Sequence, residues 1–121
     1  MNIDDYNILI LHTGIYKVYD RDDLKDLINY FIDYFGTKCD LNWIDVSNIT
    51  DMGNIFEYSD FNGDISKWDV SNVEDMRSMF YNSDFNGDIS NWDVSNVIEM
   101  AFMFAQSYFT GDISNWDVSS V

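Results

Sequence analysis

The sequence contains no proline, one cysteine and one histidine, and it has few basic residues. Among its 121 residues, only 6 are Lys or Arg, while 22 are Asp or Glu. A single cysteine, Cys39, excludes an intrachain disulfide and a cysteine-rich metal site. The apolar run at residues 8–11 follows two aspartates, so this N-terminus lacks the basic start and the apolar length of a secretion signal. No segment approaches the length of a membrane-spanning helix.

The acidic excess narrows the range of partners. The formal net charge is −16, which repels nucleic acids and anionic membranes and favours proteins with a basic surface. We therefore expect no direct nucleic-acid binding and no membrane association. The predicted location is cytoplasmic or intracellular in a host cell, or the cell surface if the chain is a fragment of an exported protein. At 46% apolar and 17% aromatic residues, the chain has enough apolar material for one folded domain.

Three copies of one phrase dominate the C-terminal two thirds of the chain. They read FNGDISKWDVSN at 61–72, FNGDISNWDVSN at 85–96 and FTGDISNWDVSS at 109–120. Their period is 24 residues, and positions 24 apart are called a slot below. The period predicts repeat turns at 37–60, 61–84 and 85–108 and a partial turn at 109–121. One turn buries too little apolar surface to fold unaided, so we expect the turns to stack.

The apolar spacing within a turn predicts one short strand followed by one short helix. In the second copy, residues 65–70 place Trp68 and Val70 two apart, as on one face of a strand, whereas the apolar positions of 73–80 recur at i, i+3, i+6 and i+7. Asn72 with Asp75 predicts the helix cap, and Asn62-Gly63 predicts the preceding turn. The expected fold class is an α/β solenoid of 24-residue strand–helix turns.

Residues 1–36 are predicted to be an N-terminal cap on the solenoid at 37–121. A helix is expected from residues 20–23 to Gly36, and short strands are expected at 6–11 and 15–19, turning near Gly14. At the other end, Val121 stops where the next helix is due. Either the chain is an excerpt of a longer array, or its open C-terminal edge pairs with another copy in a homo-oligomer.

The phrase DISNWDVSNV and the motif Met76-x-x-Met79-Phe80 resemble the repeats of BspA-like surface proteins, which include the mycoplasma lipoprotein repeat family. The resemblance covers residues 39–121. It implies a right-handed, leucine-rich-repeat-like solenoid used for protein contact or adhesion. It brings no catalytic residue to this chain.

Recurring aspartates are the candidate site residues. One set lies between an inward apolar residue or Trp and an inward Val, and is expected to face outward on the sheet; a second set opens the DIS triplets. Each carboxylate could accept backbone N–H bonds or lie in solvent, could contact a basic partner, or could bind a cation. The segment 60–64 matches a calcium loop only in part, so a tight turn is favoured. The predicted partner-binding residues are Asp45, Asp69, Asp93 and Asp117, with Asp64, Asp88 and Asp112.

No constellation predicts an enzyme, a metal or a cofactor. His12 has no partnered nucleophile nearby, Cys39 shares the slot of Gly63, and the tryptophans are predicted to pack inward. The leading hypothesis is a non-enzymatic protein-binding module that presents an acidic surface to a basic partner protein. The alternatives are a nucleic-acid-mimicking inhibitor of a host DNA- or RNA-binding protein, as a virus or phage would encode, and a fragment of a cell-surface adhesin.

Overall fold

The computed structural model describes residues 14–121. Its elements are strand β1 (Tyr16–Lys17), helix α2 (Arg21–Phe35) and strand β2 (Ile44–Asp45). The two strands pair in parallel, with Tyr16 opposite Ile44 and Lys17 opposite Asp45. β1 falls within the strand predicted at 15–19, whereas the strand predicted at 6–11 and His12 lie outside the described residues.

Helix α2 forms where local sequence signals predicted it. The Asp20 side chain accepts the Asp23 N–H at 2.9 Å and so caps the first turn. At the other end, Gly36 has a φ of 93°, and its N–H donates to the Ile32 carbonyl. The buried apolar face of the helix consists of Leu24, Leu27, Ile28 and Phe31.

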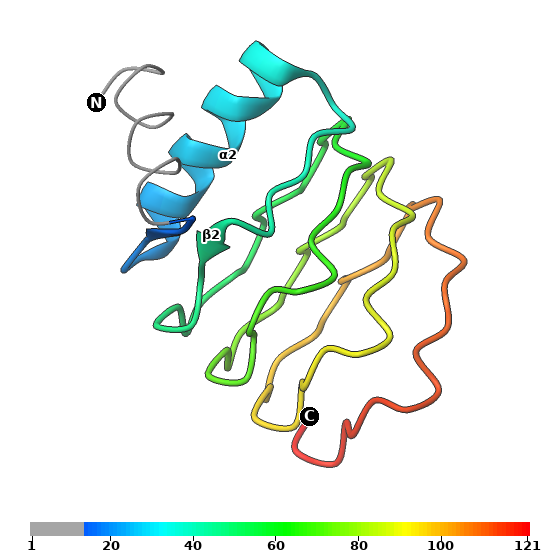
Figure 1. The fold of residues 1–121 in the computed structure, drawn as a ribbon. Helices are drawn as coiled ribbons and strands as arrows, with labels where there is room; N and C mark the ends of the chain where they lie inside the picture. The colour runs from blue at the N-terminus through cyan, green and yellow to red at the C-terminus, as the bar shows by residue number, and fades with distance from the viewer. Residues whose placement is uncertain (1–13) are drawn as a thin grey trace.

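After α2 the chain runs as a stack of irregular coils. Figure 1 shows these coils lying side by side in chain order, with α2 at one end of the stack. We call residues 37–60, 61–84, 85–108 and 109–121 the first to fourth coils, the last being partial. Backbone hydrogen bonds join neighbouring coils: the N–H of Met52 donates to the Asp75 carbonyl at 2.8 Å, and the N–H of Met76 donates to the Glu99 carbonyl at 2.9 Å.

The predicted right-handed solenoid of strand–helix turns is wrong, because residues 37–121 contain no helix and only the two-residue strand β2. In the segment expected to be helical, the N–H groups of Ser78 and Phe80 donate to the Ala101 and Met103 carbonyls of the next coil. They therefore make no i to i−4 bonds. Positive φ values recur in each of these segments and are incompatible with a right-handed helix; they occur at Asn54, Tyr58, Ser78, Asn82, Phe102 and Gln106.

The helix cap predicted at Asn72 is also wrong, because no helix begins there. The Asn72 side-chain amide donates to the Ser47 carbonyl of the preceding coil at 2.8 Å, and Asn96 repeats this contact with Ser71 at 2.7 Å. These asparagines therefore connect coils. The helical spacing of the apolar residues records which side chains point into the stack rather than a helix.

Stacked aromatic rings fill the core. Phe80 lies between Phe56 and Phe104, with ring centroids 5.6 Å apart on each side and nearly parallel planes. The ring centroid of Trp92 lies 6.5 Å from those of Trp68 and Trp116. All three tryptophans are buried, as predicted, and each indole N–H donates to a carbonyl of the preceding coil. Burial of a large ring therefore leaves no indole donor unpaired.

Gly63 is required by close packing, although the sequence suggested a turn residue. Its φ is not positive, but an added Cβ would lie 1.9 Å from the Cys39 carbonyl oxygen and 2.7 Å from the Phe61 ring. Gly87 meets the Phe85 ring in the same way. The Phe-x-Gly spacing thus lets each phenylalanine ring pack flat on the backbone two residues later.

Candidate functional site

The seven predicted site residues each precede a turn of a coil, and one of them, Asp45, is also the last residue of β2. Each carboxylate accepts a hydrogen bond from the backbone N–H two residues later, which closes an Asx-turn. These N···O distances are between 2.8 and 3.0 Å. We call Asp64, Asp88 and Asp112 the first acidic row, and Asp45, Asp69, Asp93 and Asp117 the second acidic row. Their first role is therefore to shape the backbone.

Serine hydroxyls strengthen four of these corners. The Ser90 hydroxyl donates to Asp88 at 2.6 Å, and the Ser95 hydroxyl donates to Asp93 at the same distance; Ser66 and Ser71 do likewise for Asp64 and Asp69. The side chain and the N–H of Ser90 lower the pKa of Asp88, and those of Ser95 lower the pKa of Asp93. Hydrogen bonds to the charged form thus hold these carboxyls ionised.

The same effect occurs at further positions in both rows. The side chains and N–H groups of Ser114 and Ser119 lower the pKa of Asp112 and Asp117. For Asp64, the Asn42 side chain is the largest cause of the lowered pKa, followed by Ser66. Repulsion works in the other direction, since Asp64 and Asp112 raise the pKa of Asp88. The serine contacts outweigh this repulsion, so neighbouring coils present ionised carboxylates side by side.

Six of the seven aspartates face solvent, and among these the charge of Lys67 acts on Asp64 and lowers its pKa. Asp64, Asp88 and Asp112 are exposed, as are Asp69, Asp93 and Asp117. No ion pair within residues 14–121 involves any of them. Asp45 differs, because it is only partly exposed and lies 3.8 Å from the Lys17 ammonium on β1. The prediction of outward-facing carboxylates is confirmed, but they sit on turns rather than on a sheet face.

Residues 25–121 match the family model described as "Mycoplasma protein of unknown function, DUF285". The chain belongs to this family. No curated protein and no solved structure matches it. This match confirms the predicted resemblance to a mycoplasma repeat family. The matched residues include both acidic rows.

Sequence reasoning missed a third acidic position in this DUF285 chain. Asp51, Asp75 and Glu99 share a slot, and each side chain accepts the N–H two residues later. They were assigned to the first turn of a helix. Ser59, Ser83 and Ser107 close a fourth corner in the same way through their hydroxyl oxygens. The signal available in the sequence was an Asp or Ser that recurs in one slot, because such a side chain can accept the backbone N–H two residues later.

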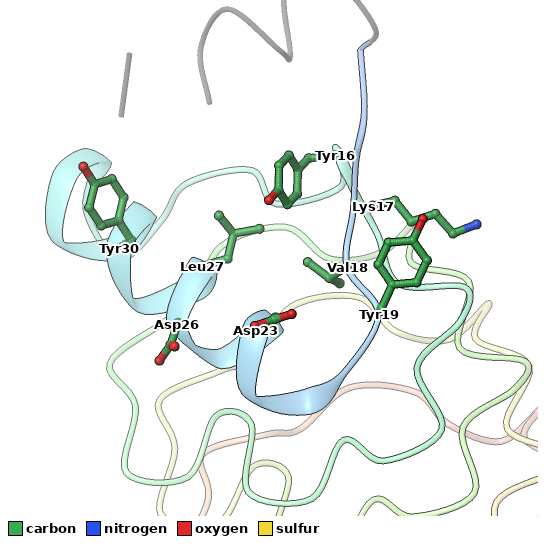
Figure 2. Close-up of a pocket in the computed structure, with 8 residues that line it drawn as sticks. All are labelled: Tyr16, Lys17, Val18, Tyr19, Asp23, Asp26, Leu27 and Tyr30. Atoms are coloured by element: carbon green, nitrogen blue, oxygen red, sulfur yellow. The ribbon is translucent and has the colours of Figure 1, made fainter. Parts of the chain in front are cut away.

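A hollow of about 390 Å³ lies beside α2. Figure 2 shows its lining, with Tyr16, Lys17, Val18 and Tyr19 on one side and Asp23, Asp26, Leu27 and Tyr30 from α2 on the other. The Lys17 ammonium is 5.9 Å from the centre of the Tyr19 ring. Carboxylates, one ammonium and phenol rings offer polar contacts but no activated nucleophile in this lining.

Within residues 14–121, no three or more His, Cys, Asp or Glu side chains are grouped so that they could hold a metal ion. No helix in that range is long and apolar enough to cross a membrane. Cys39 is half-buried, and burial raises the pKa of its thiol. A raised thiol pKa is the opposite of what a cysteine nucleophile needs.

Proposed function

We propose that this DUF285 protein is a non-enzymatic binding module whose acidic rows contact a basic surface of a partner protein. One observation carries the proposal: six exposed carboxylates of the two rows have no ion pair in the described chain. Serine contacts lower the pKa of four of them, Asp88, Asp93, Asp112 and Asp117. An Asx-turn needs only one carboxylate oxygen. Asparagine supplies the same acceptor without the charge, so folding does not account for an acid at every corner.

The spacing of the rows supports contact with several cations at once. Carboxylates of neighbouring coils lie close enough to interact, since the charge of Asp117 raises the pKa of Asp93 and the charges of Asp64 and Asp112 raise that of Asp88. Charges this close are only partly screened at physiological salt, so they add to one local field. A field of this kind attracts a basic partner and raises its association rate.

We also propose that the repeats of this chain are related to those of BspA-like surface proteins. The phrase DISNWDVSNV at 88–97 supports it, since the same phrase supplies both the core and the corners of a coil. Asp88 and Asp93 close turns, while Trp92 and Val94 are buried. A relationship to BspA-like proteins would favour protein contact, including adhesion, over catalysis.

The test compares charge at the rows with charge elsewhere. D69N, D93N and D117N combined keep the turn acceptors and remove three charges from the second acidic row. A matched variant combines D26N, D33N and D60N, which removes three charges from other exposed positions. An octalysine peptide serves as the probe, with affinity measured by calorimetry at low and near-physiological salt. We expect the row variant to bind more weakly and with less dependence on salt than the matched variant.

If both triple variants lose the same affinity for the octalysine peptide, net charge alone drives binding and the rows have no special role. Retained binding in the row variant would contradict the proposal directly. Circular dichroism and urea unfolding of all three proteins separate a folding defect from a binding defect.

A further inference from the structure

An asparagine followed by a glycine recurs in one slot of the second and third coils, at Asn62-Gly63 and Asn86-Gly87. This pair favours deamidation, because glycine carries no side chain that would hinder attack by its own backbone nitrogen on the preceding side-chain amide. Both asparagines are exposed, so water reaches them. Each pair therefore has the covalent chemistry and the solvent access that deamidation needs.

Two features of the stack keep this pair in place. An added Cβ on Gly87 would lie 2.7 Å from the Phe85 ring, so no larger residue fits there. The side chain before each glycine joins two coils: Asn62 Oδ1 accepts the Asn86 N–H at 2.8 Å, and Asn86 Oδ1 accepts the Thr110 N–H at 2.8 Å. Packing and bonding between coils thus explain why a chemically labile pair stands in this slot.

The nitrogen that would attack is free of internal hydrogen bonds. The N–H groups of Gly63 and Gly87 donate to no acceptor in the described part of the chain, residues 14–121. The flanking N–H groups of Asn62 and Asp64, in contrast, donate to carbonyls of the first coil. No hydrogen bond within that part of the chain has to break for the glycine nitrogen to lose its proton.

The side-chain amide that would be attacked is held in place. Ring closure requires the Cγ of an asparagine to turn onto the nitrogen of its own glycine. The bond from Asn62 Oδ1 to the N–H of Asn86 ties this amide to the next coil instead. Asn86 is held by a further contact, since its Nδ2 donates to Thr110 Oγ1 at 3.3 Å. Either amide can turn only after two coils separate locally, which is an opening short of global unfolding.

We propose that Asn62 and Asn86 are deamidation sites and that local separation of neighbouring coils gates the reaction. After opening, the glycine nitrogen loses its proton and forms a bond to the asparagine Cγ. The bond between Cγ and Nδ2 breaks, and the amide nitrogen leaves with that proton as ammonia. Water then opens the cyclic imide at one of its two ring C–N bonds, which gives aspartate or isoaspartate.

The two products change the coil in different ways. Aspartate keeps a side-chain oxygen that can accept the N–H of the next coil. Its new charge lies two residues before Asp64 or Asp88, beside the first acidic row. Isoaspartate lengthens the backbone where glycine already packs against a phenylalanine ring, so the coil cannot re-form with the same contacts. The reaction therefore either adds to the acidic surface or disrupts a coil.

The test incubates the full chain at mildly alkaline pH, with and without guanidinium chloride, and locates deamidation by peptide mapping with mass spectrometry. We expect Asn62 and Asn86 to deamidate at least about tenfold faster in the denatured protein, because only open coils react in the folded one. Asn48 and Asn96 are the internal controls, since each precedes a β-branched residue that hinders attack in both states. Equal rates in folded and denatured protein would overturn the gating. No excess over the controls after denaturation would overturn the site assignment.

The variant T110P removes the N–H that holds Asn86 Oδ1 and leaves the bond of Asn62 unchanged. In the folded variant, checked by circular dichroism, Asn86 should deamidate about two- to tenfold faster, the factor that one hydrogen bond contributes. Asn62 should keep its rate. An unchanged rate at Asn86, or equal acceleration at both sites, would contradict gating by this bond. The comparison with and without denaturant needs no variant, so it decides the proposal even if T110P does not fold.

Discussion

Helix α2 and the coils satisfy their backbone polar groups in opposite ways. In α2 the bonds are local, as where the Gly36 N–H donates to the Ile32 carbonyl. In the coils they cross about one full repeat, as where the Phe56 N–H donates to the Met79 carbonyl at 2.9 Å. The backbone groups inside a helix are paired within the helix itself, whereas a coil exposes unpaired N–H or carbonyl groups on any side that lacks a neighbouring coil.

This difference makes the two ends of the stack unlike. At the α2 end, Arg21 and Lys25 side chains contact first-coil carbonyls, including those of Gly53 and Ile55. At the other end, the N–H groups of Met100, Phe102, Phe104 and Gln106 have no acceptor within residues 14–121. The helix thus ends the stack, because its side chains substitute for the N–H groups of a preceding coil.

Truncation of a core ring tests the dependence of coils on their neighbours and should have the largest effect. Phe80 is fully buried between Phe56 and Phe104. We expect F80A to lower the free energy of unfolding by about 3–5 kcal/mol, measured by urea denaturation. Phe35 at the end of α2 is half exposed, so F35A should cost below about 1 kcal/mol. Similar losses in the two variants would mean that α2 and the coils are equally dependent on packing.

Loss of one corner hydroxyl tests how far burial controls the turns. The Ser83 oxygen accepts the Phe85 N–H at 3.1 Å, and Ser83 is fully buried. S83A leaves that N–H unpaired away from water, so we expect a loss of about 1–3 kcal/mol in urea unfolding. Ser107 makes the same contact with Phe109 at 3.0 Å but is only half-buried. If S107A costs as much as S83A, burial is not what makes this hydroxyl matter.

The same comparison explains which parts of the fold the sequence predicted. α2 depends on signals within one segment: Asp20 at its start, Gly36 at its end and an apolar stripe between them. The 24-residue period and the inward tryptophans were also readable, because each copy repeats them. These features need no knowledge of what lies beside a coil.

The path of the backbone through each coil was not readable in the same way. The apolar spacing of residues 73–80 fits a helix, but the N–H groups of Met76, Ser78 and Phe80 donate to a coil more than 20 residues away. Spacing reports which side chains face the core and not where the backbone bonds go. For the second acidic row, outward exposure was predicted, while hydrogen bonds from backbone N–H groups were only one of the alternatives. The bonds between coils depend on coil register, which no single motif encodes.

A change at the α2 end tests the capping contact. Lys25 Nζ lies 3.0 Å from the Asn54 carbonyl oxygen and 3.4 Å from that of Ile55. K25M keeps the apolar stem and removes the donor, so we expect a loss of about 1 kcal/mol in urea unfolding. K67M is the control, since Lys67 is exposed on the second coil. A loss in K67M equal to that in K25M would show that any lysine of this acidic chain stabilises it through charge alone.

The smallest expected effect is the pH dependence of the coil corners. Ser90 and Ser95 lower the pKa of Asp88 and Asp93 in the folded protein. The folded state therefore binds fewer protons than the unfolded state near the ordinary Asp pKa of about 3.9. The stabilisation is present above that pH and is lost as the pH falls through the lowered folded values.

D88N combined with D93N removes both titrations and keeps both turn acceptors, so its urea midpoint should fall less than that of the unmodified protein as the pH drops below about 4. D26N combined with D33N on α2 makes the same change in net charge and should follow the unmodified protein. If both double variants flatten the pH profile equally, relief of general charge repulsion explains it, and the corner serines do not set the acid sensitivity of the coils.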